Sequence, residues 1–141
     1  MSVVKSKQSE GKLVVVTKAR TLAEYTLRIC ANEKNFPKRY RWCLTAKIVD
    51  SAMNINNGVN MANSVYVYDE TDYALRKRYQ TQALAETYAL LSMVDIAYRA
   101  YNLETARVEY WTRLIIDVQT LIRNWRKAEI EKHDKIIGQQ L

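Results

Sequence analysis

The chain has 141 residues, enough for one domain with a substantial core, and only three glycines and one proline. So few turn-forming residues argue against a β-sandwich or an α/β fold with many tight turns and favour long helices. Lys and Arg number 22 against 15 Asp and Glu, a net charge of +7. That charge suits binding to a polyanion, but it also occurs in proteins whose charge serves only solubility.

The first helix is expected over residues 12–32. Residues 1–11 before it are polar, include Lys5 and Lys7, and are expected to form a flexible basic tail. The motif "NFP" ends the helix, because proline restricts the preceding residue to extended conformations. At about 100° per residue, one face of this segment is apolar. Its expected core positions are Val15, Val16, Ala19, Leu22, Ala23, Thr26, Ile29 and Cys30.

The second helix is expected to begin near Pro37 or Lys38. Its apolar positions repeat at steps of three and four residues and form one narrow stripe of Leu44, Ile48, Ala52, Ile55, Val59 and Ala62. Asparagines border this stripe: Asn56, Asn60 and Asn63 on one edge, Asn54 and Asn57 toward the other. Their amides can hydrogen-bond across a subunit contact or face water.

The third helix is expected over residues 72–101, after a connection "VYVYDETD" in which Thr71 or Asp72 caps the helix. It has two apolar stripes and is therefore expected to be buried on two sides. The first stripe contains Leu75, Tyr79, Ala83, Leu90, Met93, Ala97 and Tyr101. The second contains Leu84, Tyr88, Leu91 and Tyr98, which form either an oligomer interface or part of a deeply buried central helix.

The fourth helix follows the turn "NLET", in which Asn102 ends the third. Its stripe consists of Trp111, Leu114, Ile115, Val118, Leu121, Ile122 and Trp125. Beyond Lys132 the pattern decays, and residues 134–141 are expected to be a flexible tail. Four long helices joined by mostly short connections predict an all-α fold, an antiparallel up-down-up-down four-helix bundle over residues 12–133.

Reactive groups are scarce. The one histidine, His133, lies near the C-terminus, no Cys or His spacing resembles a zinc site, and there is no glycine-rich phosphate loop. Cys30 and Cys43 are expected to be buried free thiols. We therefore expect no catalysis, cofactor, metal or small-molecule substrate. The chain also lacks a signal-peptide pattern and an apolar run long enough for a membrane span, so we expect a cytoplasmic protein.

Three basic clusters with aromatic neighbours are the candidate nucleic-acid contacts. Basic groups can bind phosphates and aromatic rings can stack on bases, although the same clusters could be a solvated face. The candidates are Lys38, Arg39 and Arg41; Arg76, Lys77 and Arg78; and Arg123, Arg126 and Lys127. In an up-down-up-down bundle the second and third clusters lie near one another, and the first lies at the opposite end.

The segment "FPKRYRWCLT" resembles a family pattern, F-P-K…R-[YW]-x-L-T, at the beginning of a second helix. The matching residues are Phe36, Pro37, Lys38, Arg41, Trp42, Leu44 and Thr45. The family consists of small bacterial four-helix bundles. It includes proteins encoded in intervening sequences of large-subunit ribosomal RNA genes, and the accessory variability determinant (Avd) of diversity-generating retroelements. The four-helix layout over residues 12–133 and Trp125 late in the fourth helix also match.

The resemblance implies a barrel-shaped pentamer with a basic surface that binds RNA or DNA, and a reverse transcriptase as partner. The chain departs from the intervening-sequence relatives at "INNGVNMANS", where they have an N-I-A-E-G-like motif. The leading expectation is therefore a non-catalytic, oligomeric, nucleic-acid-binding protein of a mobile element. The alternative is a protein–protein interaction module that does not bind nucleic acid directly.

Overall fold

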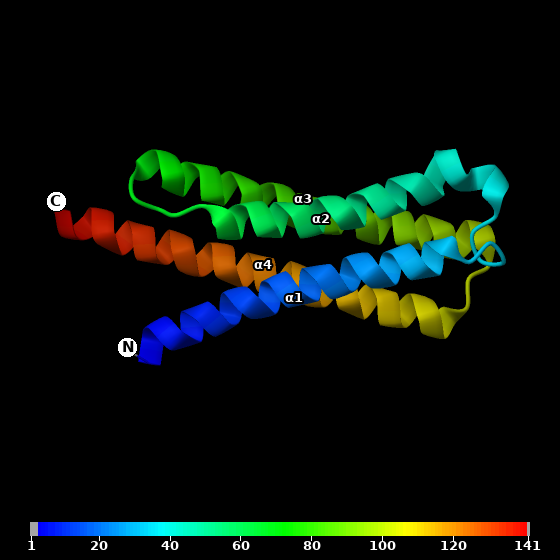
Figure 1. The fold of residues 1–141 in the computed structure, drawn as a ribbon, viewed down its shortest axis with the longest axis horizontal. Coiled ribbons are helices and arrows are strands. Elements are labelled where there is room, and N and C mark those ends of the chain that lie inside the picture. Colours follow the sequence, from blue (N-terminus) through cyan, green and yellow to red (C-terminus); the bar gives the residue numbers. More distant parts are fainter. Residues whose placement is uncertain (1–2, 141) are drawn as a thin grey trace.

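The computed structural model describes the backbone of residues 3–140 and the side chains of residues 14–139. This part of the chain is all-helical and contains no strand (Figure 1). Its four long helices are α1 (Val3–Ala31), α2 (Ala46–Ser64), α3 (Glu70–Tyr101) and α4 (Thr105–Gln140). Two short helical turns precede α2: a 3-10 turn, η1 (Lys38–Tyr40), and a π turn, η2 (Arg41–Thr45).

Each long helix packs on two others around one core. α2 packs on α1 and α3, and α4 packs on α3 and α1. Figure 1 places the α1–α2 and α3–α4 connections at one end of the molecule and the α2–α3 connection at the other. The prediction of a helical bundle is therefore confirmed.

The predicted core of the first, second and fourth helices is confirmed. All the predicted stripe positions of these helices are buried or partly buried. Trp111 is fully buried, and its indole Nε1 donates a hydrogen bond to Thr26 Oγ1 at 3.0 Å. This bond satisfies the one polar group that the large indole brings into the core.

The buried face of α3 agrees only in part with the predicted first stripe: Ala83, Leu90 and Ala97 are buried, and its other four residues are partly buried. The buried residues of α3 follow a three- and four-residue spacing: Arg76, Gln80, Ala83, Thr87, Leu90, Val94 and Ala97. Three of these seven, Arg76, Gln80 and Thr87, are polar, and apolar spacing does not reveal them. Leu75 and Tyr79, which were expected in the stripe, lie at its partly buried edge.

Several helix boundaries also differ from prediction. α1 begins at Val3 and α4 continues to Gln140, so residues 3–11 and 134–140, expected to be tails, are helical. Asp69, rather than Thr71 or Asp72, caps α3, and its side chain accepts a hydrogen bond from the Asp72 amide at 2.8 Å. Asn102 ends α3 as predicted, in the left-handed region at φ 53°.

Gly58 allows α2 and α3 to approach closely. A Cβ at this position would lie 3.0 Å from the Cβ of Ala83, closer than two side chains normally pack. The asparagines of the second helix thus flank a tight contact between helices.

Among the described residues, no helix has an apolar stretch able to cross a membrane.

Candidate nucleic-acid interface

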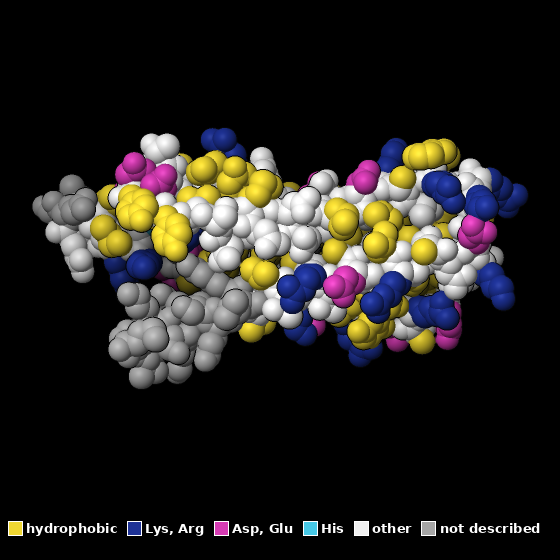
Figure 2. Space-filling view, viewed as in Figure 1, with side chains coloured by type: hydrophobic (Ala, Val, Ile, Leu, Met, Phe, Trp, Pro, Cys, Tyr) yellow, Lys and Arg dark blue, Asp and Glu magenta, His cyan; other side chains and the backbone are white. Residues whose placement is uncertain are grey.

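The first basic cluster forms an exposed corner at one end of the bundle. We call Lys38, Arg39, Tyr40, Arg41 and Trp42 the Trp42 corner; all five are exposed. The only ion pair among them joins Lys38 Nζ to Glu33 at 3.3 Å, and both side chains are solvated, so it is weak. Figure 2 shows Lys and Arg side chains gathered at this end of the molecule. The corner can therefore offer its cations to an anionic partner.

Aromatic packing fixes the corner to the core. The ring of Tyr40 stacks on Tyr101, with centroids 5.5 Å apart and planes 18° apart. Phe36 is buried and packs edge-on against Tyr101 and Trp111, at 5.5 and 6.1 Å. Burial raises the pKa of the Tyr101 phenol above its ordinary value, because the charged form would lose its hydration. The backbone around the cluster is thereby held by side chains that reach the centre of the bundle.

The aromatic rings of Tyr40 and Trp42 each add a feature to the corner. The guanidinium carbon of Arg39 lies 4.9 Å from the centroid of the Tyr40 ring, a cation–π distance. Trp42 comes from the π turn η2 and is 80% exposed. The sequence grouped Trp42 with the cations but gave no sign of this exposure, because an α-helical pattern does not reveal a π turn.

The second and third clusters come together as predicted. Arg126 Nε donates to Thr81 Oγ1 at 2.9 Å, and Arg123 donates to the Tyr88 hydroxyl, so both α4 arginines reach across to α3. Lys77 lies one turn before Thr81, which hydrogen-bonds back to its carbonyl. We call Lys77, Arg123 and Arg126, together with Arg78 and Lys127, which are exposed and adjacent to them in the chain, the α3–α4 basic patch.

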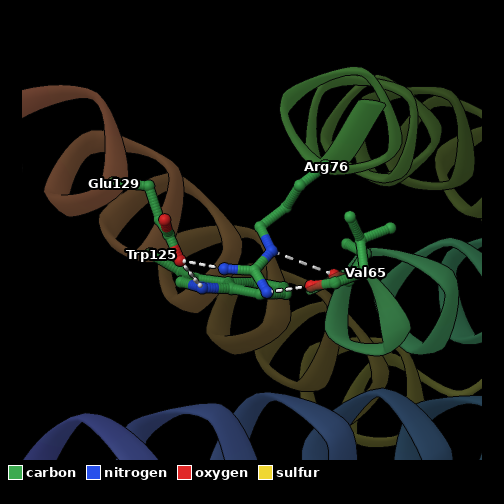
Figure 3. A network of polar contacts seen from close by, with 5 residues as sticks. Val65, Arg76, Trp125 and Glu129 are labelled. Atoms are coloured by element: carbon green, nitrogen blue, oxygen red, sulfur yellow. Dashed lines mark hydrogen bonds and ion pairs between the residues drawn. The ribbon is translucent and has the colours of Figure 1, made fainter. Parts of the chain in front are cut away.

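Arg76 does not belong to this patch. It is only 8% exposed, and its guanidinium already has three partners (Figure 3). Nε donates to Ala62 O at 3.2 Å, one terminal nitrogen donates to Val65 O, and the other pairs with Glu129 Oε1 at 2.8 Å. The predicted phosphate contact by Arg76 is therefore replaced by a structural one.

The buried arginine joins three helices. Ala62 and Val65 lie at the end of α2, where the last carbonyls of a helix lack intrahelical donors, and Arg76 on α3 supplies them. Glu129 on α4 balances the guanidinium charge and also accepts from Trp125 Nε1 at 3.2 Å (Figure 3). Trp125 thus takes part in this network as well as in the predicted stripe.

The four predicted oligomer contacts lie in different environments. Leu84, Leu91 and Tyr98 are partly buried against the core of their own chain, and the Tyr98 hydroxyl lies 2.8 Å from Thr105 Oγ1. Tyr88 is 53% exposed. It is the one of the four with most of its side chain accessible to a second subunit.

An open groove runs between α2 and α3, with a volume of about 850 Å³. Polar amides and small side chains line it, among them Asn54, Asn57, Asn60, Gln82 and Ala85. One wall is fixed by Glu86, which accepts hydrogen bonds from Ser51 at 2.8 Å and Asn54 at 3.3 Å. Three of the asparagines singled out in the sequence therefore border a surface depression.

The two cysteines differ, contrary to expectation. Cys30 is buried, and burial raises the pKa of its thiol to about 12. Cys43 is exposed, because the π turn directs Leu44 and Thr45 toward the core and leaves Cys43 on the outside. Among the described side chains, no three Cys, His, Asp or Glu converge to hold a metal ion.

Comparison with protein-family models, with curated proteins and with solved structures gave no significant match.

Proposed function

We propose that this chain is a non-catalytic helical bundle that binds nucleic acid, RNA or DNA, as an Avd-like accessory protein of a diversity-generating retroelement or another mobile element. The observation behind the proposal is the Trp42 corner, where three exposed cations and an exposed tryptophan lie on two successive short turns, η1 and η2. Phosphates attract such cations, and bases stack on such rings. The α3–α4 basic patch supplies a second cationic surface.

The resemblance at "FPKRYRWCLT" adds the biological setting. It implies a homopentamer in the cytoplasm, with a reverse transcriptase as protein partner. Contacts at both ends of α3 and α4 support the antiparallel arrangement that this family has. Glu70, at the start of α3, lies 2.8 Å from His133 late in α4, and Tyr98, late in α3, contacts Thr105 at the start of α4.

Salt-dependent binding tests the proposal. Each phosphate that a cation neutralises adds about 0.9 to the slope of log affinity against log salt on B-DNA. Replacing Lys38, Arg39 and Arg41 with Gln should flatten the slope by up to about 3. The same should follow from Gln at Lys77, Arg123 and Lys127.

The matched control replaces three exposed cations outside both surfaces, Lys18, Arg20 and Arg113, with Gln. It removes the same charge, so a general effect of net charge would alter this variant equally. Slopes that stay unchanged in both cluster variants would refute the assignment of the phosphate contacts.

A protein-interaction module without direct nucleic-acid binding is the second candidate. The groove between α2 and α3 favours it, because amides at its border can hydrogen-bond to a protein backbone or side chain. Absence of nucleic-acid binding at low salt would favour this candidate over the first.

A further inference from the structure

Trp42 is the one tryptophan of the chain that faces solvent. Trp111 is fully buried and Trp125 is partly buried, whereas Trp42 is 80% exposed. An indole left in water forgoes the burial of apolar surface that stabilises the other two. A tryptophan in this position is well suited to a partner that covers its ring.

The turn that presents Trp42 is fixed on both sides. Before it, Tyr40 stacks on Tyr101; after it, Thr45 is buried and leads into α2. A π turn of this kind is rare and often lies at a functional site. A ligand that stacks on the ring would therefore lose little binding energy to ordering of the protein backbone.

A hollow adjoins the ring. It has a volume of about 310 Å³ and lies between the end of α1 and the start of α2, lined by Leu27, Phe36, Arg41, Trp42 and Val49 among others. Two carboxylates, Glu33 and Asp50, line it beside the one arginine, so the hollow itself does not attract an anion. Its apolar walls can accept a flat ring beside Trp42, whereas Lys38 and Arg39, which would meet phosphates, lie outside it.

Exposure alone does not single out Trp42. Tyr66 and Tyr68 are 77% and 86% exposed, but they stack on each other at 6.2 Å. Acidic residues, Asp69 and Glu70, follow them in the chain. Trp42, in contrast, directly follows Arg41 and lies within four residues of two further exposed cations.

We propose that Trp42 stacks on an unpaired base of single-stranded nucleic acid while Lys38, Arg39 and Arg41 contact the neighbouring phosphates. This inference rests on the proposed nucleic-acid binding and adds the class of ligand. In a duplex the faces of internal bases are already stacked, so the ring has access to them only in single strands, loops or ends. The Trp42 corner is thus a single-strand site, whereas the α3–α4 basic patch, which lacks an exposed tryptophan, has no such preference.

The test compares a labelled single-stranded 12-mer of mixed sequence with the matching duplex, by anisotropy. Trp42→Ala should weaken binding to the single strand about 5- to 150-fold, the range for loss of one stacked base. Its affinity for the duplex should change less than 2-fold, and the salt slope should stay as in wild type because no phosphate contact is removed. Trp42→Phe, which keeps an aromatic face, should recover most of the loss.

Tyr68→Ala is the matched control, since it removes an exposed ring that has no Lys or Arg within four residues of it in the chain. Its affinity for the single strand should equal that of wild type. Wild-type tryptophan fluorescence should also be quenched by the single strand, and the Trp42→Phe variant should lose that quenching.

Three results would overturn the inference. Single-strand binding that survives Trp42→Ala would show that the ring is not used, while the proposed function would stand. Equal weakening for single strand and duplex would assign Trp42 a general positioning role rather than base stacking. Failure of wild type to bind either ligand would refute the proposed function together with the inference, and would favour a protein as the partner that covers Trp42.

Discussion

At the scale of single residues, Arg76 shows how a charged side chain can serve the core. Its three partners lie in α2, on the residue directly after α2, and in α4, and only 8% of the residue is exposed, so its guanidinium is shielded from a phosphate. A planar guanidinium donates in several fixed directions, which a lysine ammonium cannot reproduce. The basic character of this residue is thus used for packing.

Arg76→Met should destabilise the protein by about 3–5 kcal/mol, because it leaves Glu129 largely buried without its cation. Arg76→Lys should recover little of that loss. Urea unfolding monitored by circular dichroism measures both. The adjacent and exposed Arg78 provides the control, since Arg78→Met should stay within about 0.5 kcal/mol of wild type. Equal unfolding midpoints for the Arg76 and Arg78 variants would contradict the structural role.

The two thiols should react at very different rates. Cys43 is exposed and should be labelled by a thiol reagent at pH 8, whereas Cys30, whose pKa is about 12, should be labelled only on unfolding. Mass spectrometry should find one label on the native protein, and Cys43→Ser should abolish it. Two labels at equal rates would contradict the burial of Cys30.

The same thiol predicts a pH dependence of stability. Its pKa in the folded protein, about 12, is above the ordinary value of 9.0, so the folded state holds the proton more tightly than the unfolded state. The contribution of this thiol to the free energy of unfolding is fully present below pH 9 and is lost as the pH rises from 9 toward 12. Cys30→Ala should remove this part of the loss of stability at alkaline pH, although the substitution also leaves a small cavity.

At the scale of helices, most of the fold could be predicted from the sequence. Apolar spacing identified the buried faces of α1, α2 and α4, and Asn102 marked the end of α3. The buried face of α3 was predicted only in part, because Arg76, Gln80 and Thr87 are buried yet polar. A polar residue enters a core when partners from other helices satisfy it, and those partners cannot be read from local spacing.

The candidate site was predictable in part. Residue type and order identified the cations of the Trp42 corner, and helix order predicted that the α3 and α4 clusters meet, as the bond from Arg126 to Thr81 confirms. The exposure of Trp42 and Cys43 depends on the π turn, for which the sequence pattern gave no sign. The burial of Arg76 depends on contacts with distant helices.

The start of α3 gives a prediction at this scale. Asp69 accepts from the Asp72 amide, and the Asp72 side chain accepts from the Tyr68 amide at 3.1 Å, so two backbone donors are satisfied reciprocally. Asp69→Ala should cost about 1 kcal/mol of stability. Thr71→Ala, in the same exposed turn, should cost much less. If thermal unfolding showed a larger loss of stability for Thr71→Ala than for Asp69→Ala, Thr71 would be the cap, as first predicted from the sequence.

At the scale of the whole molecule, the second stripe of α3 is the surface predicted to join the proposed subunits. Glutamate at Leu84 and Leu91 would test the predicted stripe, but both residues pack on the core, so these changes would also destabilise the monomer. A substitution at Tyr88 separates dissociation of the oligomer from destabilisation of the monomer, because Tyr88 is more than half exposed.

Tyr88→Glu should dissociate the oligomer while leaving the helix content unchanged. Analytical ultracentrifugation with circular dichroism measures both quantities. The control is Tyr68→Glu, at another highly exposed tyrosine, which should leave the mass unchanged. A Tyr88 variant with wild-type mass would exclude this face as the subunit interface.

The most direct test of the whole account is the affinity of wild-type protein for labelled RNA and DNA, measured by anisotropy over a series of salt concentrations. Three cations are exposed at the Trp42 corner and three more, Arg78, Arg123 and Lys127, in the α3–α4 basic patch, so binding at low salt should weaken steeply as salt rises. No binding at low salt, or binding insensitive to salt, would contradict it and leave the bundle as a protein-interaction module.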